Sequence, residues 1–158
     1  MNLLAPCEAH THRSAIADGC IGCHMKTTSR YLVGGHSVNM AYDLGGGEEV
    51  LNTDACTTCH GAISDFGDVG HVQATVDSLI TDLSARLEAA GLTTAGVPKS
   101  VSTSRDSAGA VYNLISVMED RSHGVHNAKY IEGLLKSSIL YISGALPQPG
   151  PAPLAARR

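Results

Sequence analysis

Four cysteines and two histidines form the most chemically specific pattern in this chain of 158 residues. They lie in two short segments, CIGCH at residues 20–24 and CTTCH at residues 56–60. A C-x-x-C pair suits a zinc site, a redox dithiol or the covalent attachment of haem. The histidine that directly follows each pair favours the third chemistry. With eight histidines in the chain, chance would place one after both pairs in about one chain in 400.

Haem attachment accounts for every residue of the two segments. Two thiols add across the vinyl groups of the porphyrin, and the adjacent histidine becomes an axial ligand of the iron. The sequence therefore predicts two covalent haem c groups. The predicted attachment residues are Cys20, Cys23, Cys56 and Cys59, and the predicted proximal ligands are His24 and His60.

Two other chemistries remain as alternatives for the cysteine pairs. The gap between Cys23 and Cys56 is longer than usual for a four-cysteine zinc knuckle. A thioredoxin-like dithiol needs a βαβ setting, and neither pair has one. A zinc-binding structural module stays the stronger of the two, and a pyridine haemochrome assay that found no haem would favour it.

The remaining histidines are candidates for the second axial ligand of each iron. Because they outnumber the usable methionines, we expect bis-histidine ligation, which usually gives a lower potential than His/Met ligation. The main candidates are His126, which directly precedes a predicted helix, and His36, whose two preceding glycines let the backbone approach a flat macrocycle. The weaker candidates, some of which could act across a subunit contact, are His12, His10, His123 and His71.

From about residue 66 onward, apolar residues recur at helical spacing, which predicts the helices that would position the C-terminal histidine candidates. Helices are predicted at 71–90, 105–121 and 127–143. Asp68 and Ser104 are the expected N-caps of the first two, and Gly91 and Gly144 the expected ends of the first and third. The predicted buried stripes are Val72, Val76, Leu79, Ile80, Leu83 and Leu87, then Val111, Leu114, Ile115 and Met118, then Ile131, Leu134, Leu135 and Ile142.

The predicted fold is mainly α, in a single dihaem domain at 1–145. It comprises an N-terminal arm at 1–19, a haem-attachment region at 20–65 and a helical region at 66–145. We expect loops and short turns to wrap the haems, with about three helices packed beside them. No good hairpin signal is present. A Pro-rich tail at 146–158 is expected to dock on a neighbour or to stay mobile.

The composition limits the partners. The formal net charge of −4 gives no reason to expect nucleic acid or an acidic membrane. No run of about 18 apolar residues is present, so no membrane span is expected. With five Tyr, one Phe and no Trp, the chain has few of the large rings that usually fill a core, which leaves room for another bulky apolar body.

With CIGCHM, ACTTCHG and DRSHGVHNAKY considered together, the chain resembles a multihaem c-type cytochrome. The resemblance is to the C-terminal part of proteins related to cytochrome c nitrite reductase and their electron-transfer relatives, and covers roughly residues 20–143. In that group a G-V-H-N-P-x-Y segment opens a long helix, and its histidine ligates a haem iron. The matching residues here are Gly124, Val125, His126, Asn127 and Tyr130, with Ala128 in place of the proline. A ligand is also common in the region of His36.

The resemblance implies an electron carrier rather than an enzyme. In nitrite reductases the attachment motif of the catalytic haem usually ends in lysine, and neither motif here does; they also hold more haems than two. The expected partners are other redox proteins or copies of the chain itself, which could polymerise into an extracellular haem wire. The alternative is a small reductase of nitrite, hydroxylamine or peroxide, or a fragment of one, with an open haem site.

The resemblance also implies export, because bacteria attach haem c outside the cytoplasmic membrane. We expect a periplasmic or extracellular protein, although no secretory signal is visible in MNLLAPC. In that compartment Cys7 could form a disulfide between chains or stay an unreactive thiol. The segment LLAPC also resembles a lipoprotein cleavage site, although the proline before the cysteine argues against it.

Overall fold

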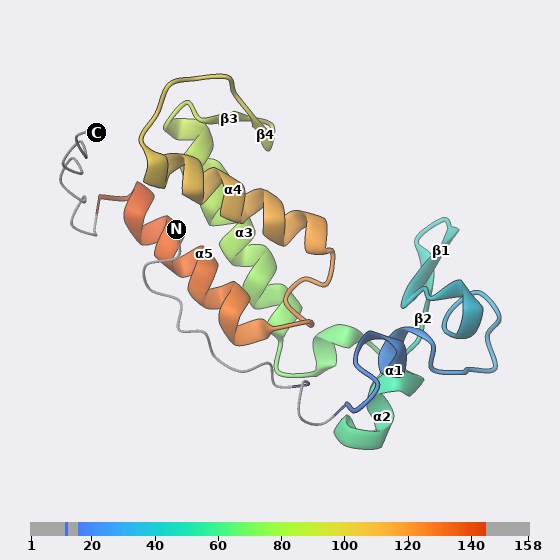
Figure 1. Cartoon of the computed structure of the whole chain (residues 1–158). Coiled ribbons are helices and arrows are strands. Elements are labelled where there is room, and N and C mark those ends of the chain that lie inside the picture. The colour runs from blue at the N-terminus through green and yellow to red at the C-terminus, as the bar shows by residue number, and fades with distance from the viewer. Residues whose placement is uncertain (1–11, 13–15, 145–158) are drawn as a thin grey trace, which may run out of the picture.

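The computed structural model describes residue 12 and residues 16–144, which form two lobes (Figure 1). Residues 16–68 are called the attachment lobe and residues 72–144 the helical lobe. The candidates Cys7 and His10 and the predicted tail at 146–158 lie outside the described residues.

The attachment lobe is built from short elements. Both C-x-x-C-H segments form single short helices, separated by a hairpin. The expected loops and short turns are therefore accompanied by short helices and a hairpin. The elements are α1 (Cys20–His24), the 3-10 helix η1 (Gly35–Ser37), β1 (Ala41–Gly45), β2 (Glu48–Leu51), α2 (Asp54–His60) and the 3-10 helix η2 (Phe66–Asp68).

Two hairpins correct the expectation that the chain has no good hairpin signal. Strands β1 and β2 pair antiparallel, and the turn uses Gly45, Gly46 and Gly47, all with positive φ. All five residues of β1 are exposed, so the strand lacks the alternation of apolar and polar residues that reveals a half-buried strand. The second hairpin, β3 (Thr93–Thr94) with β4 (Val97–Pro98), turns at Ala95 and Gly96, which also have positive φ.

Three long helices make up most of the helical lobe, and their bounds lie within one residue of the prediction. They are α3 (Val72–Ala89), α4 (Arg105–Asp120) and α5 (Ala128–Ile142). Helix α5 packs against both α3 and α4, as Figure 1 shows. Helices dominate the described residues, so the mainly α class holds, with two small antiparallel sheets added to it.

The core of the molecule lies between these helices. Most of the predicted stripe residues are buried or partly buried there. The second stripe needs one correction: Val117 is 3 % exposed and Met118 is 47 % exposed. Small Ala110 lies on the core face, so the stripe follows Ala110, Leu114 and Val117 at i, i+4 and i+7. The core cluster is Val76, Leu83, Leu87, Leu92, Ala110, Leu114, Val117, Ile131, Leu134 and Leu135.

The helix ends follow the predicted signals in all but one case. Ser104 accepts a hydrogen bond from the Ser107 backbone N–H at 3.0 Å, and Gly91 and Gly144 take the positive φ expected after a helix. Asp68 is not the N-cap of α3. Its carboxylate instead accepts hydrogen bonds from the backbone N–H groups of Ser64 and Asp65 and closes η2.

No helix within residues 16–144 is both long and apolar enough to cross a membrane. This agrees with the expectation of no membrane span.

Candidate functional site

The two C-x-x-C-H helices, α1 and α2, pack against each other in the attachment lobe. All four of their thiols are free: Cys20 and Cys59 are exposed, and Cys23 and Cys56 are half-buried. Burial raises the pKa of the Cys23 and Cys56 thiols, and neighbouring thiols raise it further, with Cys59 acting on both. Groups attached at the two motifs would therefore be neighbours.

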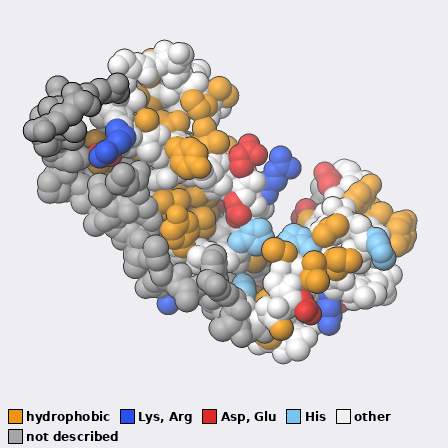
Figure 2. All heavy atoms as spheres, viewed as in Figure 1, with side chains coloured by type: hydrophobic (Ala, Val, Ile, Leu, Met, Phe, Trp, Pro, Cys, Tyr) orange, Lys and Arg blue, Asp and Glu red, His pale blue; other side chains and the backbone are white. Residues whose placement is uncertain are grey.

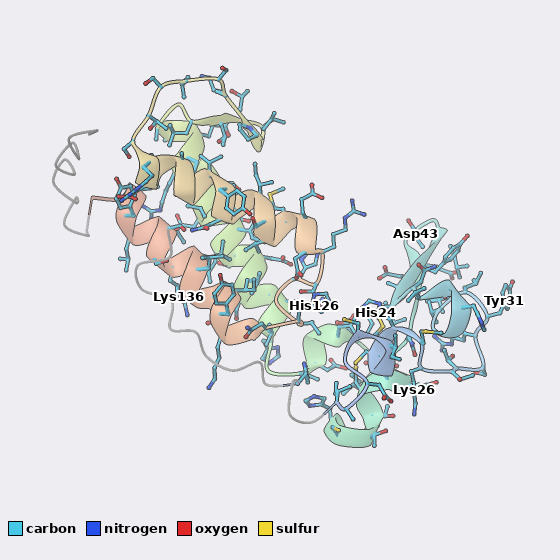
Figure 3. The ribbon with its side chains drawn as sticks, in the orientation of Figure 1. His24, Lys26, Tyr31, Asp43, His126 and Lys136 are labelled. Carbon is cyan, nitrogen blue, oxygen red and sulfur yellow. The ribbon has the colours of Figure 1, made fainter. Side chains whose placement is uncertain are left out.

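Each motif histidine has the ring of a second histidine beside it. The ring centroids of His24 and His126 are 6.1 Å apart, with a 45° angle between the ring planes. Figure 3 shows this pair where the two lobes meet, with His24 from α1 and His126 from the loop before α5. In the space-filling view of Figure 2, histidine side chains gather at this junction.

The second pair joins His60 to His12. Their ring centroids are also 6.1 Å apart, and the ring planes are nearly perpendicular at 87°. Both residues belong to the same chain, although they are far apart in sequence. The structure therefore brings a weaker candidate, His12, to the second motif.

The spacing of both pairs suits two imidazoles that bind one metal from opposite sides. With a metal–nitrogen bond of about 2.0–2.1 Å, a ring centroid lies roughly 3.2 Å from the metal, so two opposed rings lie roughly 6.3 Å apart. The observed separation of 6.1 Å in each pair is close to this value. The centroid spacing of each pair is therefore compatible with two imidazoles that bind one iron.

Hydrogen bonds orient the rings of the first pair. His24 Nδ1 donates to the Val38 carbonyl oxygen at 2.9 Å, and His126 Nδ1 lies 2.8 Å from Asp120 Oδ1. With both Nδ1 atoms engaged, Nε2 is the nitrogen that remains on each ring. Ligating histidines are commonly fixed in this way, because the second nitrogen is held by a carbonyl or a carboxylate.

The Asp120 carboxylate contacts Ser122 as well as the imidazole of His126. The Ser122 hydroxyl donates a short hydrogen bond to Asp120 Oδ2 and accepts one from the His126 backbone N–H at 3.3 Å. Burial raises the pKa of Asp120, but the hydrogen bonds from Ser122 and His126 outweigh it, so this pKa lies below its ordinary value. The carboxylate is therefore charged at neutral pH.

The loop that carries His126 has an unusual backbone. Arg121, His123 and Gly124 all have positive φ, a conformation that costs energy for the two residues that are not glycine. A Cβ on Gly124 would lie 2.7 Å from Val76 Cγ2 on α3, so only glycine lets the loop lie this close to the helix. His123 Nδ1 lies 2.5 Å from Asp77 Oδ1 of α3, which is a second contact between the loop and this helix.

The attachment lobe has almost no core of its own. Among its described residues, Val33 is the only buried hydrophobic side chain. Asn52, which is fully buried, donates long hydrogen bonds to the carbonyls of Cys23 and Lys26, and its Oδ1 has no partner among the described residues. A lobe of this size without apolar burial is unstable by itself. A large apolar group held at α1 and α2 would supply what is missing, so this observation also fits haem.

Three other predicted ligands have no opposed imidazole among the described residues. His36 lies exposed in η1. His71 precedes α3 in a left-handed conformation, and its carbonyl accepts a hydrogen bond from the Thr75 hydroxyl. His123 pairs with Asp77. For the zinc alternative, no group of three or more His, Cys, Asp or Glu side chains in the described residues could hold a metal ion.

Sequence reasoning missed the partners of the ligand candidates. Asp120 precedes His126 by six residues in EDRSHGVH, but the distance in sequence gave no sign of contact, because the intervening turn is not periodic. The carbonyl of Val38 carries no side-chain signal at all.

Comparisons with known proteins found no matching family model, no matching curated protein and no matching solved structure. The resemblance to multihaem cytochromes thus stays a prediction from the motifs.

Proposed function

We propose that the protein is a dihaem c-type cytochrome that carries electrons between redox partners. One haem would be attached at Cys20 and Cys23 and ligated by His24 and His126. The other would be attached at Cys56 and Cys59 and ligated by His60 and His12. The observation that carries the proposal is that each C-x-x-C-H histidine lies beside a second imidazole, with the same ring-centroid separation of 6.1 Å in both pairs.

This assignment keeps His126 from the sequence prediction and replaces His36 with His12. His36 was favoured because of its glycines, but its ring is exposed and no opposed imidazole is found for it in the described residues. His12 is opposed to His60 within the chain, so no subunit contact is needed to complete the second iron.

Bound haem supplies a one-electron Fe(III)/Fe(II) couple. The chain's residues have two tasks. The thiols of α1 and α2 would hold two groups side by side, since these helices pack together. The four imidazoles would ligate the two irons, which would prevent a substrate from binding there and would suit electron transfer without ligand exchange.

The proposal is tested by expressing the full chain in a bacterium with a cytochrome c maturation system. We expect a mass increase equal to two haems and a pyridine haemochrome spectrum with two haems per chain. We also expect a low-spin spectrum that carbon monoxide leaves largely unchanged after reduction. His126→Ala and His12→Ala should each open one iron to carbon monoxide, while the matched His36→Ala and His71→Ala should not.

The results separate the proposal from its alternatives. Absence of haem would contradict it and leave the zinc module. A wild-type haem that binds carbon monoxide strongly would favour the small reductase with an open site. The predicted polymer and the predicted export are separate proposals: negative-stain images that show only dispersed particles would contradict the polymer, and a cytoplasmic location of the mature protein would contradict export.

A further inference from the structure

The ligand candidate His126 shares a hydrogen bond with a carboxylate that the electron-transfer proposal does not require. The contact joins His126 Nδ1 to Asp120 Oδ1 at 2.8 Å, and the Asp120 side chain is 31 % exposed. In contrast, His24 on the opposite side donates to the neutral carbonyl of Val38 at 2.9 Å. One iron would thus have one axial imidazole bound to an anion and the other bound to a neutral acceptor.

The position of Asp120 runs against local helix preference. Asp120 is the last residue of α4, where the partial negative charge of the helix end disfavours a carboxylate. Local rules are usually broken where a residue serves a site. Here the carboxylate lies in a closed set of contacts, with Ser122 on its second oxygen and His126 on its first.

A carboxylate acceptor changes an axial imidazole in a definite direction. It draws the Nδ1 proton toward itself, so the imidazole gains imidazolate character and donates more strongly through Nε2. A stronger anionic donor stabilises Fe(III) relative to Fe(II), and hydrogen bonding to ligands is one of the means by which a protein sets a haem potential.

We propose that Asp120 is a positioning residue that lowers the reduction potential of the haem attached at Cys20 and Cys23, acting through His126. This inference rests on the proposed function, because it requires His126 to be an axial ligand. The second haem would be ligated by a different pair of histidines, so its reduction potential serves as a reference within the same molecule.

The test is a redox titration of the holoprotein at pH 7, followed by EPR. The ring planes of the two histidine pairs differ, at 45° and 87°, and near-perpendicular axial rings give a low-spin signal with a larger maximum g value. The two haems can therefore be followed separately. The haem ligated by His24 and His126, whose ring planes make 45°, is called the 45° site. For Asp120→Asn we expect the ratio of reduced to oxidised haem at this site to rise about tenfold at a fixed solution potential. This change corresponds to a rise of ~59 mV in its reduction potential for one electron.

The chain offers a matched control in a second histidine–carboxylate contact, which joins His123 of the same loop to Asp77 of α3. Asp77→Asn removes the carboxylate that contacts His123 at 2.5 Å, and His123 is not an assigned ligand. We expect no change in either potential for this variant. An unchanged potential at the 45° site in Asp120→Asn, or an equal shift in Asp77→Asn, would overturn the inference.

A second variant decides the matter if Asp120→Asn loses the His/His low-spin signal. Ser122→Ala keeps the carboxylate and His126 but removes the hydroxyl that donates to Asp120 Oδ2. The carboxylate then becomes a stronger acceptor at Oδ1, and we expect the potential of the same haem to fall. A potential that stays or rises would contradict the inference. A preparation without haem would instead contradict the proposed function, so the two failures are distinguishable.

Discussion

The two lobes obtain their stability in different ways. The helical lobe buries ten apolar side chains in a single cluster between three helices. The attachment lobe buries one hydrophobic side chain, Val33, among its described residues. One lobe therefore holds together by ordinary side-chain packing, and the other is arranged around positions where a covalent group would supply the apolar mass. Under the proposed function, the chain would combine a self-sufficient unit with one that depends on a cofactor.

Under the proposed function, the largest effect that tests this difference is removal of the haems. A full-chain variant with serine at all four motif cysteines should lose amide protection throughout residues 16–68, because little apolar surface remains buried there. The amides of α3, α4 and α5 should keep their protection. Hydrogen exchange measured by mass spectrometry on the variant and the holoprotein would check this. Equal protection of the attachment lobe in both would contradict it.

A core truncation should damage the helical lobe whether or not haem is attached. Leu83 is fully buried in α3, and Leu83→Ala should lower the free energy of unfolding of this lobe by about 2–5 kcal/mol. Urea unfolding followed by circular dichroism would measure it in both forms. The control Leu140→Ala, at a side chain 42 % exposed on α5, should cost about 0.5 kcal/mol. A much larger loss in one form than in the other would contradict the independence of this lobe.

A substitution in the ligand loop should affect the junction of the lobes. Gly124→Ala places a Cβ 2.7 Å from Val76 Cγ2 at a φ of +91°, and we expect it to cost about 1–3 kcal/mol. It should also weaken the low-spin signal of one haem. Gly91→Ala has a similar φ of +73° but nothing within 4 Å of the new Cβ, so it isolates the backbone cost. If the two variants behave alike, the contact with α3 does not position the loop.

The smallest effect concerns acid sensitivity at the border between the lobes. Hydrogen bonds from the backbone N–H groups of Ser64 and Asp65 lower the pKa of Asp68 from its ordinary value of 3.8. A lowered pKa contributes stability that is present above the ordinary value and lost as pH falls through the folded value. Asp68→Asn should therefore be less stable than wild type above about pH 4, with the difference vanishing in stronger acid. Urea midpoints measured between acid and neutral pH would show this, and a constant difference would contradict it.

The helical lobe could be predicted closely from the sequence because its signals are local. Apolar residues recur at helical spacing, and Ser104, Gly91 and Gly144 mark ends in ways that depend on a few neighbouring residues. Met118 was misplaced because positions i+3 and i+4 both lie near the buried face, and only packing against α3 and α5 decides between them.

For the attachment lobe, the sequence predicts a chemistry, which stays a prediction, and little of the structure. The C-x-x-C-H motif itself identifies the candidate attachment residues. The elements around the two motifs have few buried side chains, so their sequences lack a periodic pattern of apolar residues. The neighbours of His24 and His60 come from distant parts of the chain, at His126 and His12. The sequence marks both as candidates, but no pattern in it specifies which motif each one approaches. His36 had a suitable local setting and still lies in no such pair within the described residues.

The pairing of His24 with His126 has a consequence for the order of events during synthesis. The two residues are 102 positions apart in the printed sequence, so a haem attached at α1 would wait for its second imidazole while the rest of the chain emerges. The helical lobe can fold without that haem, because its core needs no cofactor. Under the proposed function, docking of the helical lobe would bring His126 to the first iron, and this ligand would join the two lobes. A chain truncated before residue 126 would then lack the ligand and carry an open haem.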